Sequence, residues 1–182
     1  MSDKYTARNP EGIYFITITV TDWIDVFTRA EYKLEIVRSL KYCQEQKGLI
    51  LHAWCLMPSH LHLIASAKEP GALPAIIRDF KKFTSRRITE MIELEPESRR
   101  KWMVDRFKYA GRHLQRITNY HFWQDGYHAV ELASNHLQQQ KLDYLHRNPV
   151  ADLTVAEAEH YVFSSASTYA GLGGLLQVEE LQ

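Results

Sequence analysis

Apolar and polar residues alternate in several short stretches of the chain, which predicts β-strands. Residues 13–21 alternate β-branched and aromatic residues with threonines, the pattern of a half-buried strand. Two further strands are predicted at 49–56 and 60–66, separated by a break around Pro58. Because proline has no backbone N–H to donate to a central ladder, Pro58 is expected between strands. A shorter strand is predicted at 127–131, after a turn.

Apolar residues recur at helical spacing between and after these strands. Gly48 supplies a C-terminal stop for the first helix, and Ser134 or Asn135 can cap the last. The last helix is expected to end at Arg147, because the residue before Pro149 is disfavoured in the α region. The third helix is predicted with or without a loop inside it. The predicted helices span residues 29–47, 72–93, 99–118 and 134–147.

The order of these elements predicts an α+β fold. Two strands joined through Pro58, with helices after the first and third strands, match a ferredoxin-like split βαβ antiparallel sheet. Helices are expected mainly on one face, leaving the other face open for a partner or for the C-terminal helix. We expect one domain over residues 1–182, in which 166–182 form a less ordered tail.

Charge is balanced overall but unevenly distributed. The 22 basic and 22 acidic residues give a net charge of zero, which counts against binding nucleic acid through bulk electrostatics. Residues 78–87, however, contain five basic residues and one acidic residue, so an anionic ligand is expected there. The alternative is a solvated helix face. The candidate DNA-binding residues are Arg78, Lys81, Lys82, Arg86 and Arg87.

The sequence predicts a soluble, cytoplasmic protein without a membrane segment. Its apolar runs are too short to span a bilayer, and its N-terminus lacks the features of a secretory signal. Cys43 and Cys55 lack metal-ligand spacing and are expected as buried small hydrophobes, without a disulfide.

The strongest candidate for chemistry is the pair His60 and His62. Alternate positions of a strand point to the same face, so both imidazoles can share one divalent metal ion. Leu61 and Leu63 would then face the core. Neutral imidazoles bind Mn²⁺ and Zn²⁺ well, and a third ligand with an oxygen donor would favour Mg²⁺ or Mn²⁺. His-x-His alone has little specificity in a chain with nine histidines.

Tyr144 and Asn148 could complete this site from the last predicted helix. They are one helical turn apart, so a phenol and a carboxamide can project together toward the metal. The alternative is that Tyr144 only packs and that Asn148 is a helix-terminal residue before a proline.

Three motifs, taken in order, resemble those of the single-tyrosine HUH transposases, in particular the REP-associated tyrosine transposase branch, over roughly residues 10–165. The resemblance implies a ferredoxin-like fold, a metal pair at His60 and His62, a nucleophile at Tyr144 and a third metal ligand at Asn148. Ser59 and the stretch 151–153 depart from the family pattern, and the second departure puts DNA contacts near the C-terminus in doubt. The motifs are Met57 to Leu63 (MPSHLHL), Phe122 to Tyr127 (FWQDGY) and Tyr144 to Val150 (YLHRNPV).

The expected function is therefore cleavage and rejoining of single-stranded or hairpin DNA through a covalent 5′-phosphotyrosine intermediate, with Mg²⁺ or Mn²⁺. A phosphotyrosine ester retains the energy of the phosphodiester, so a second 3′-OH can reverse the attack without ATP. The metal would polarise the scissile phosphate. Bases could stack on aromatic residues after the basic run, for which the candidates are Trp102, Phe107 and Tyr109.

Two other functions fit the same residues. A metal-dependent phosphodiesterase would use water as the nucleophile and leave Tyr144 structural. A regulator could have kept the fold and its DNA binding while losing catalysis. The sequence leaves open which repeat or hairpin is recognised, which metal is used, whether the chain still mobilises DNA, and whether it acts as a monomer or as a homodimer with exchanged helices.

Overall fold

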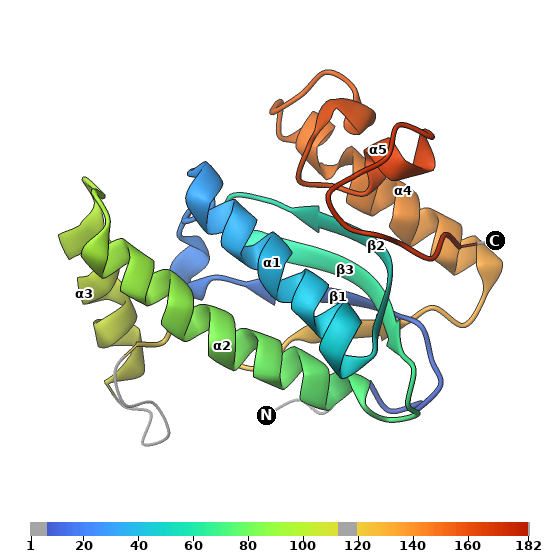
Figure 1. Ribbon diagram of the computed structural model, residues 1–182, viewed down its shortest axis with the longest axis horizontal. Helices are drawn as coiled ribbons and strands as arrows, with labels where there is room; N and C mark the ends of the chain where they lie inside the picture. The colour runs from blue at the N-terminus through green and yellow to red at the C-terminus, as the bar shows by residue number, and fades with distance from the viewer. Residues whose placement is uncertain (1–6, 113–119, 182) are drawn as a thin grey trace.

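Four antiparallel strands form the central sheet, in the order β2-β3-β1-β4 (Figure 1). This is a computed structural model, and it describes residues 7–112 and 120–181. The strand order and the connections confirm the predicted split βαβ sheet, with β1 and β3 at its centre. The strands are β1 (Tyr14–Thr19), β2 (Leu49–Leu56), β3 (His60–Ala67) and β4 (His128–Glu131).

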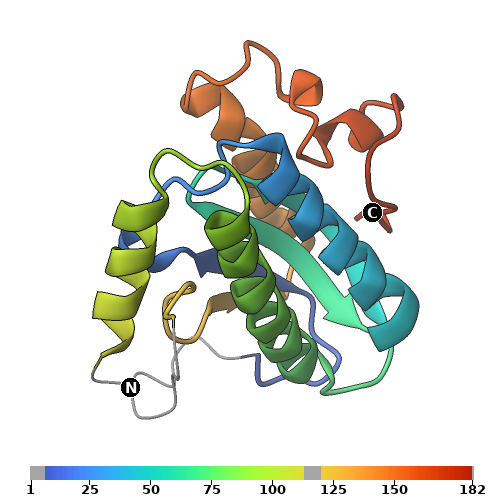
Figure 2. The same cartoon turned by 60° about the vertical axis from the view of Figure 1, so that its left-hand side comes forward.

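Helices α1 (Ala30–Lys47) and α2 (Leu73–Leu94) cover one face of the sheet (Figures 1 and 2). The larger part of the core lies between them and the sheet, and it includes Ile16, Leu61 and Leu63, each fully buried. Gly48 ends α1 in the left-handed conformation, with φ 72°, where a side chain would be strained.

A third helix, α3 (Arg100–Gly111), follows α2 and packs beside it (Figure 2). Part of the stretch predicted as helix at 99–118 therefore forms one, and residues 113–119 lie outside the described residues. Phe107 of α3 is fully buried beside Phe122, so its ring belongs to the core and cannot receive a base.

The opposite face of the sheet is covered by α4 (Asn135–Ala151), where Leu142 and Leu145 pack in a second cluster with Phe15 and Ile64. Ser134 caps this helix, because its hydroxyl accepts a hydrogen bond from the backbone N–H of Leu137 at 3.3 Å. The last helix thus lies on the face that the sequence left open for it.

The prediction that this helix ends at Arg147 is wrong. α4 continues through Pro149 to Ala151. A proline removes one backbone hydrogen bond, but Pro149 is itself buried and lies in the last turn, so packing outweighs the local preference. The backbone N–H of Asp152 then donates to the carbonyl of Asn148 at 2.9 Å and closes the helix.

The C-terminal segment runs along the edge of β2 through η3 (Ala158–His160) and α5 (Ala166–Tyr169). The backbone N–H of Leu56 donates to the Phe163 carbonyl, and that of Glu179 to the Leu51 carbonyl, both at 2.9 Å. The stretch 166–181, expected as a less ordered tail, therefore has contacts with the sheet as far as Glu179.

Cys43 and Cys55 are buried and free, as predicted. Within the part of the chain that the structure describes, no helix combines the length and the apolar character that crossing a bilayer requires.

Candidate active site

Strand β3 brings His60 and His62 together on the face covered by α4. Their ring centroids are 4.6 Å apart, at an angle of 74°. Leu61 and Leu63, which alternate with them, are fully buried on the other face. The predicted alternation is therefore confirmed, although the helix makes this face more enclosed than the sequence suggested, and His62 is only 4% exposed.

Neighbouring hydroxyl groups orient both rings. Thr17 lies directly opposite His62 in the β1–β3 ladder, and its Oγ1 shares a hydrogen bond with Nδ1 of His62 at 2.9 Å. Oγ of Ser59 is 3.2 Å from Nδ1 of His60. Both Nε2 atoms are thereby left for another ligand. His62 Nε2 is buried without a hydrogen-bond partner among the described residues, a costly state that metal binding would relieve.

Burial keeps both imidazoles neutral. Burial, together with smaller electrostatic contributions from His60 and Lys141, lowers the pKa of His62 to about 3. Burial also lowers the pKa of His60, although the carboxylate of Asp152 opposes this shift. At neutral pH, both rings are therefore in the form that ligates metal ions.

Tyr144 lies beside this pair, on α4. Its ring centroid is 5.6 Å from that of His62 and 5.9 Å from that of Phe15, both edge-on. Phe15 in turn stacks on His62, at 5.2 Å and 29°. Tyr144 is 52% exposed, so a ligand in solvent can reach it. The sheet and α4 thus place a phenol next to two imidazoles from a distant part of the sequence.

Asn148 follows one turn later on α4, where its side-chain amide donates a hydrogen bond to the backbone carbonyl of Tyr144 at 2.8 Å. Its amide nitrogen is thus used within its own helix, and its Oδ1 is the atom that could serve as a ligand. Among the described residues, no group of three or more His, Cys, Asp or Glu side chains could hold a metal ion. At this site, His60 and His62 supply the imidazole nitrogens.

Lys141 is a residue of this site that sequence reasoning missed. Its Nζ lies 5.2 Å from the ring centroid of Phe15 and 5.6 Å from that of Tyr144. It forms no ion pair with a carboxylate in the described ranges 7–112 and 120–181. The i, i+3 spacing to Tyr144 on one helix face is the signal that could have found it.

The predicted DNA-binding residues lie elsewhere. All five belong to α2, on the face of the sheet opposite α4 (Figure 2), so the structure does not bring them to Tyr144. Several already have protein partners: Lys81 donates to the carbonyls of Gln124 and Gly126, Arg86 pairs with Glu90 at 3.0 Å, and Arg78 pairs with Asp79 at 2.9 Å. Lys81, Lys82 and Arg86 also line a groove between α2 and residues 120–126.

The family model described as "Transposase IS200 like" matches residues 12–111. The matched segment contains His60 and His62 and ends before Tyr144. No curated protein matches the chain.

Among solved structures, the fold is similar to that of a REP-associated tyrosine transposase bound to a REP hairpin. The TM-score is 0.64 at 17% sequence identity, and the alignment covers 100% of this chain and 94% of that chain. A second structure is that of a Deinococcus radiodurans protein provisionally described as a transposase. It has a TM-score of 0.43 at 20% identity, covering 79% of this chain and 93% of that chain.

Proposed function

Since the chain belongs to the IS200-like transposase family, we propose that it cleaves and rejoins single-stranded or hairpin DNA through a covalent 5′-phosphotyrosine at Tyr144. The family match confirms the resemblance drawn from the three motifs. The observation that carries the proposal is the position of Tyr144, exposed on α4 with its ring 5.6 Å from that of His62.

In this reaction, the phenolic oxygen of Tyr144 attacks the scissile phosphorus, and the bond from phosphorus to the 3′ oxygen breaks. The phenol loses its proton, the departing 3′ oxygen gains one, and the 5′-phosphate stays on the protein as an ester. Attack by a second 3′-OH reverses these steps and restores the phenol, so the strand is rejoined without an energy source.

The residues present fit a divalent metal, Mg²⁺ or Mn²⁺. The Nε2 atoms of His60 and His62 would hold it, with Oδ1 of Asn148 as the third protein ligand. The orphaned, buried Nε2 of His62 and the neutral state of both rings support this assignment. When bound, the ion would supply Lewis-acid stabilisation of the charge on the phosphate.

Lys141 would contribute a positive charge beside the phenol. Lys141 forms no ion pair with a carboxylate among the described residues, so its ammonium group could pair with an anion bound next to Tyr144. The scissile phosphate is such an anion. Phe15 and Thr17 would hold the ring of His62 in place while the phosphate binds.

Hairpin DNA is the proposed substrate because the structurally similar transposase was solved with a REP hairpin. The basic residues of α2 would then contact the duplex stem rather than the strand that is cut, since they lie across the sheet from Tyr144. Tyr144 lies beside the histidines of its own chain, which supports cleavage within one subunit whether the protein is a monomer or a homodimer.

Incubation with end-labelled hairpin oligonucleotides, with Mn²⁺ or with a chelator, followed by a denaturing gel, tests this function. We expect a protein-linked strand that requires the metal and is lost in Tyr144→Phe, which should still bind the oligonucleotide. A free 5′-phosphate without an adduct would indicate the hydrolytic phosphodiesterase, and binding without cleavage would indicate a regulator. A full-yield adduct in Tyr144→Phe would remove Tyr144 from the role of nucleophile.

A further inference from the structure

A tryptophan outside the catalytic set lies at the rim of the site. Trp23 closes the short helix η2 (Thr21–Trp23), directly after β1. Its indole is 59% exposed, and its ring centroid is 5.5 Å from that of His60, at 71°. A large apolar side chain is thus presented to solvent next to the metal pair.

The backbone that presents this indole is strained. Asp22 and Trp23 both have φ of 55°, in the left-handed region, which bulky L-residues rarely adopt. Strain of this kind persists only where the surroundings impose it, and it concentrates at functional sites. Since the indole is mostly exposed, burial of Trp23 does not offset the cost.

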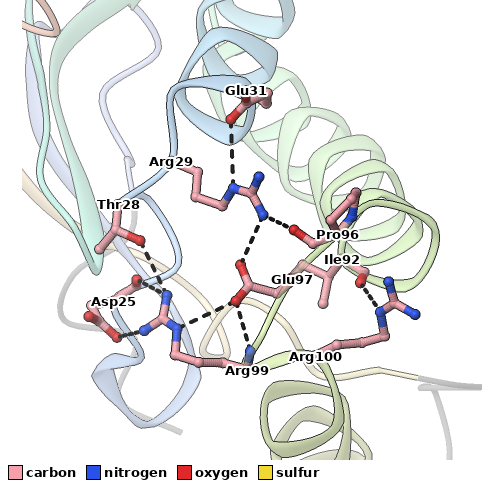
Figure 3. Close-up of polar contacts among 9 residues, drawn as sticks. All are labelled: Asp25, Thr28, Arg29, Glu31, Ile92, Pro96, Glu97, Arg99 and Arg100. Atoms are coloured by element: carbon pink, nitrogen blue, oxygen red, sulfur yellow. Dashed lines mark hydrogen bonds and ion pairs between the residues drawn. The ribbon is translucent and has the colours of Figure 1, made fainter.

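Contacts from several elements impose this conformation. Arg106 of α3 pairs with Asp22, and Arg99 pairs with Asp25 at 2.7 Å (Figure 3). The backbone N–H of Val20 donates to the carbonyl of Ser59, next to His60, at 2.9 Å. The position of the indole relative to the histidines is therefore fixed from both sides of the turn.

The ion pair between Arg99 and Asp25 is supported by a buried carboxylate. The side chain of Glu97 is 4% exposed and lies between Arg29 and Arg99, 3.7 Å from each (Figure 3). Arg99 also donates to the carbonyl of Asp25 and to the hydroxyl of Thr28, both at 3.2 Å. This network joins the chain that follows Trp23 to the connection between α2 and α3, and so limits movement of the turn.

We propose that Trp23 stacks against an unpaired nucleobase adjacent to the scissile phosphate. This inference rests on the proposed function, because it takes single-stranded DNA as the occupant of the site. Exposed aromatic rings held in place beside a phosphate site are the means by which proteins bind unpaired bases. Trp102 and Tyr109 are also exposed, but both belong to α3, and the guanidinium of Arg112 lies over the Tyr109 ring at 3.3 Å.

A double-mutant cycle between protein and DNA tests the proposal. All proteins carry Tyr144→Phe, so that the DNA strand stays uncut. We measure the affinity for a hairpin oligonucleotide with single-stranded flanks in the protein that keeps Trp23, in Trp23→Phe and in Trp23→Ala. Each unpaired nucleotide is replaced in turn by an abasic site. We expect Trp23→Ala to weaken binding about 10-fold, within the range for one stacked base, and Trp23→Phe to retain most of the affinity.

One abasic position should weaken binding to the Trp23 protein by the same factor and cause no further loss in Trp23→Ala. That position identifies the stacked base. The proposal would be overturned if, at every position, the loss of affinity from the abasic site multiplied with the loss from Trp23→Ala. Trp102→Ala is the matched control, an exposed tryptophan away from the histidines, and its effect should be independent of that abasic position.

Trp23→Gly separates stacking from folding. Glycine adopts positive φ without strain, so the melting temperature of Trp23→Gly should equal or exceed that of the protein with Trp23. Its affinity for the oligonucleotide should fall as in Trp23→Ala. Binding at the original affinity by Trp23→Gly would overturn the proposal. If a protein with Tyr144 intact forms no covalent adduct, the proposed function is wrong. If the adduct forms normally but the effects of Trp23→Ala and of every abasic site multiply, only the role of Trp23 is wrong.

Discussion

At the scale of single residues, the site depends on what holds each imidazole. The two histidines differ in this respect: His62 is buried and bonded to Thr17 from the neighbouring strand, whereas His60 is less buried and bonded to the adjacent Ser59. Hydrogen bonds of this kind fix the tautomer of a ligating ring and its direction. If the site binds a metal ion as proposed, Thr17 would therefore contribute to metal binding without touching the metal.

We expect Thr17→Val to weaken Mn²⁺ binding about 10- to 100-fold, the range for loss of an outer partner of a histidine ligand. Titration calorimetry with Mn²⁺ measures this directly, without DNA. Thr19→Val is the matched control, because Thr19 lies on the same strand and face as Thr17 and is paired with His60 of β3. In the described structure, the hydroxyl of Thr19 makes no hydrogen bond to either histidine. Equal affinities for the two variants would show that Thr17 does not orient the ligand.

Lys141 gives a second prediction at this scale. Replacing it with methionine keeps most of its volume and removes the charge beside Tyr144, so we expect the single-turnover rate of adduct formation to fall about 10- to 100-fold, as for loss of one charge-assisted hydrogen bond. A methylphosphonate at the scissile position, which lacks the phosphate charge, should reduce the difference between the two proteins. A difference that persists undiminished on that substrate would exclude contact between Lys141 and the phosphate.

At the scale of elements, local patterns in the sequence predict the strands and most of the helices. Alternation located β1, β2 and β3 to within a residue or two, because their apolar faces are buried. The local rule failed at Pro149, where packing of α4 on the sheet outweighed the preference of the preceding residue. The histidine pair follows from alternation within one strand, but the approach of Trp23 to His60 depends on tertiary contacts that no local pattern records.

The basic face of α2 is another feature that the sequence predicts only in part. The sequence shows its charge but does not show that it lies far from Tyr144. If α2 contacts the hairpin stem, Lys82→Ala combined with Arg86→Ala should lower affinity and reduce the slope of log affinity against log salt by roughly one per residue. The adduct rate at saturating DNA should stay unchanged, since these residues lie across the sheet. An unchanged salt slope would show that α2 is only a solvated helix face.

At the scale of the whole molecule, α4 must be held on the sheet for Tyr144 to meet the histidines. The C-terminal segment contributes through Ser165, whose hydroxyl lies 2.9 Å from Nε2 of His146 and accepts from the backbone N–H of Trp54 at 3.0 Å. One buried hydroxyl thus joins α4, β2 and the segment that covers the edge of β2. The position of Tyr144 therefore depends on residues that follow it in the chain.

This junction makes stability depend on pH. Burial lowers the pKa of His146 from 6.5 to about 4, with the carboxylate of Asp143 opposing the shift. Above pH 6.5, His146 is neutral in the folded and unfolded states. Between 6.5 and about 4, the unfolded state binds a proton that the folded state excludes, so the free energy of unfolding should decrease as the pH falls.

Replacing His146 with glutamine, which keeps a donor for Ser165 but does not titrate, should make this decrease smaller. Urea unfolding at neutral pH and near pH 4.5 measures the difference between the two proteins. The buried rings of His60 and His62 shift the same way and are present in both, so the comparison isolates His146. Equal losses of stability in the two proteins on acidification would mean that His146 is protonated in the fold, and that α4 is held less tightly against the C-terminal segment than its hydrogen bond to Ser165 implies.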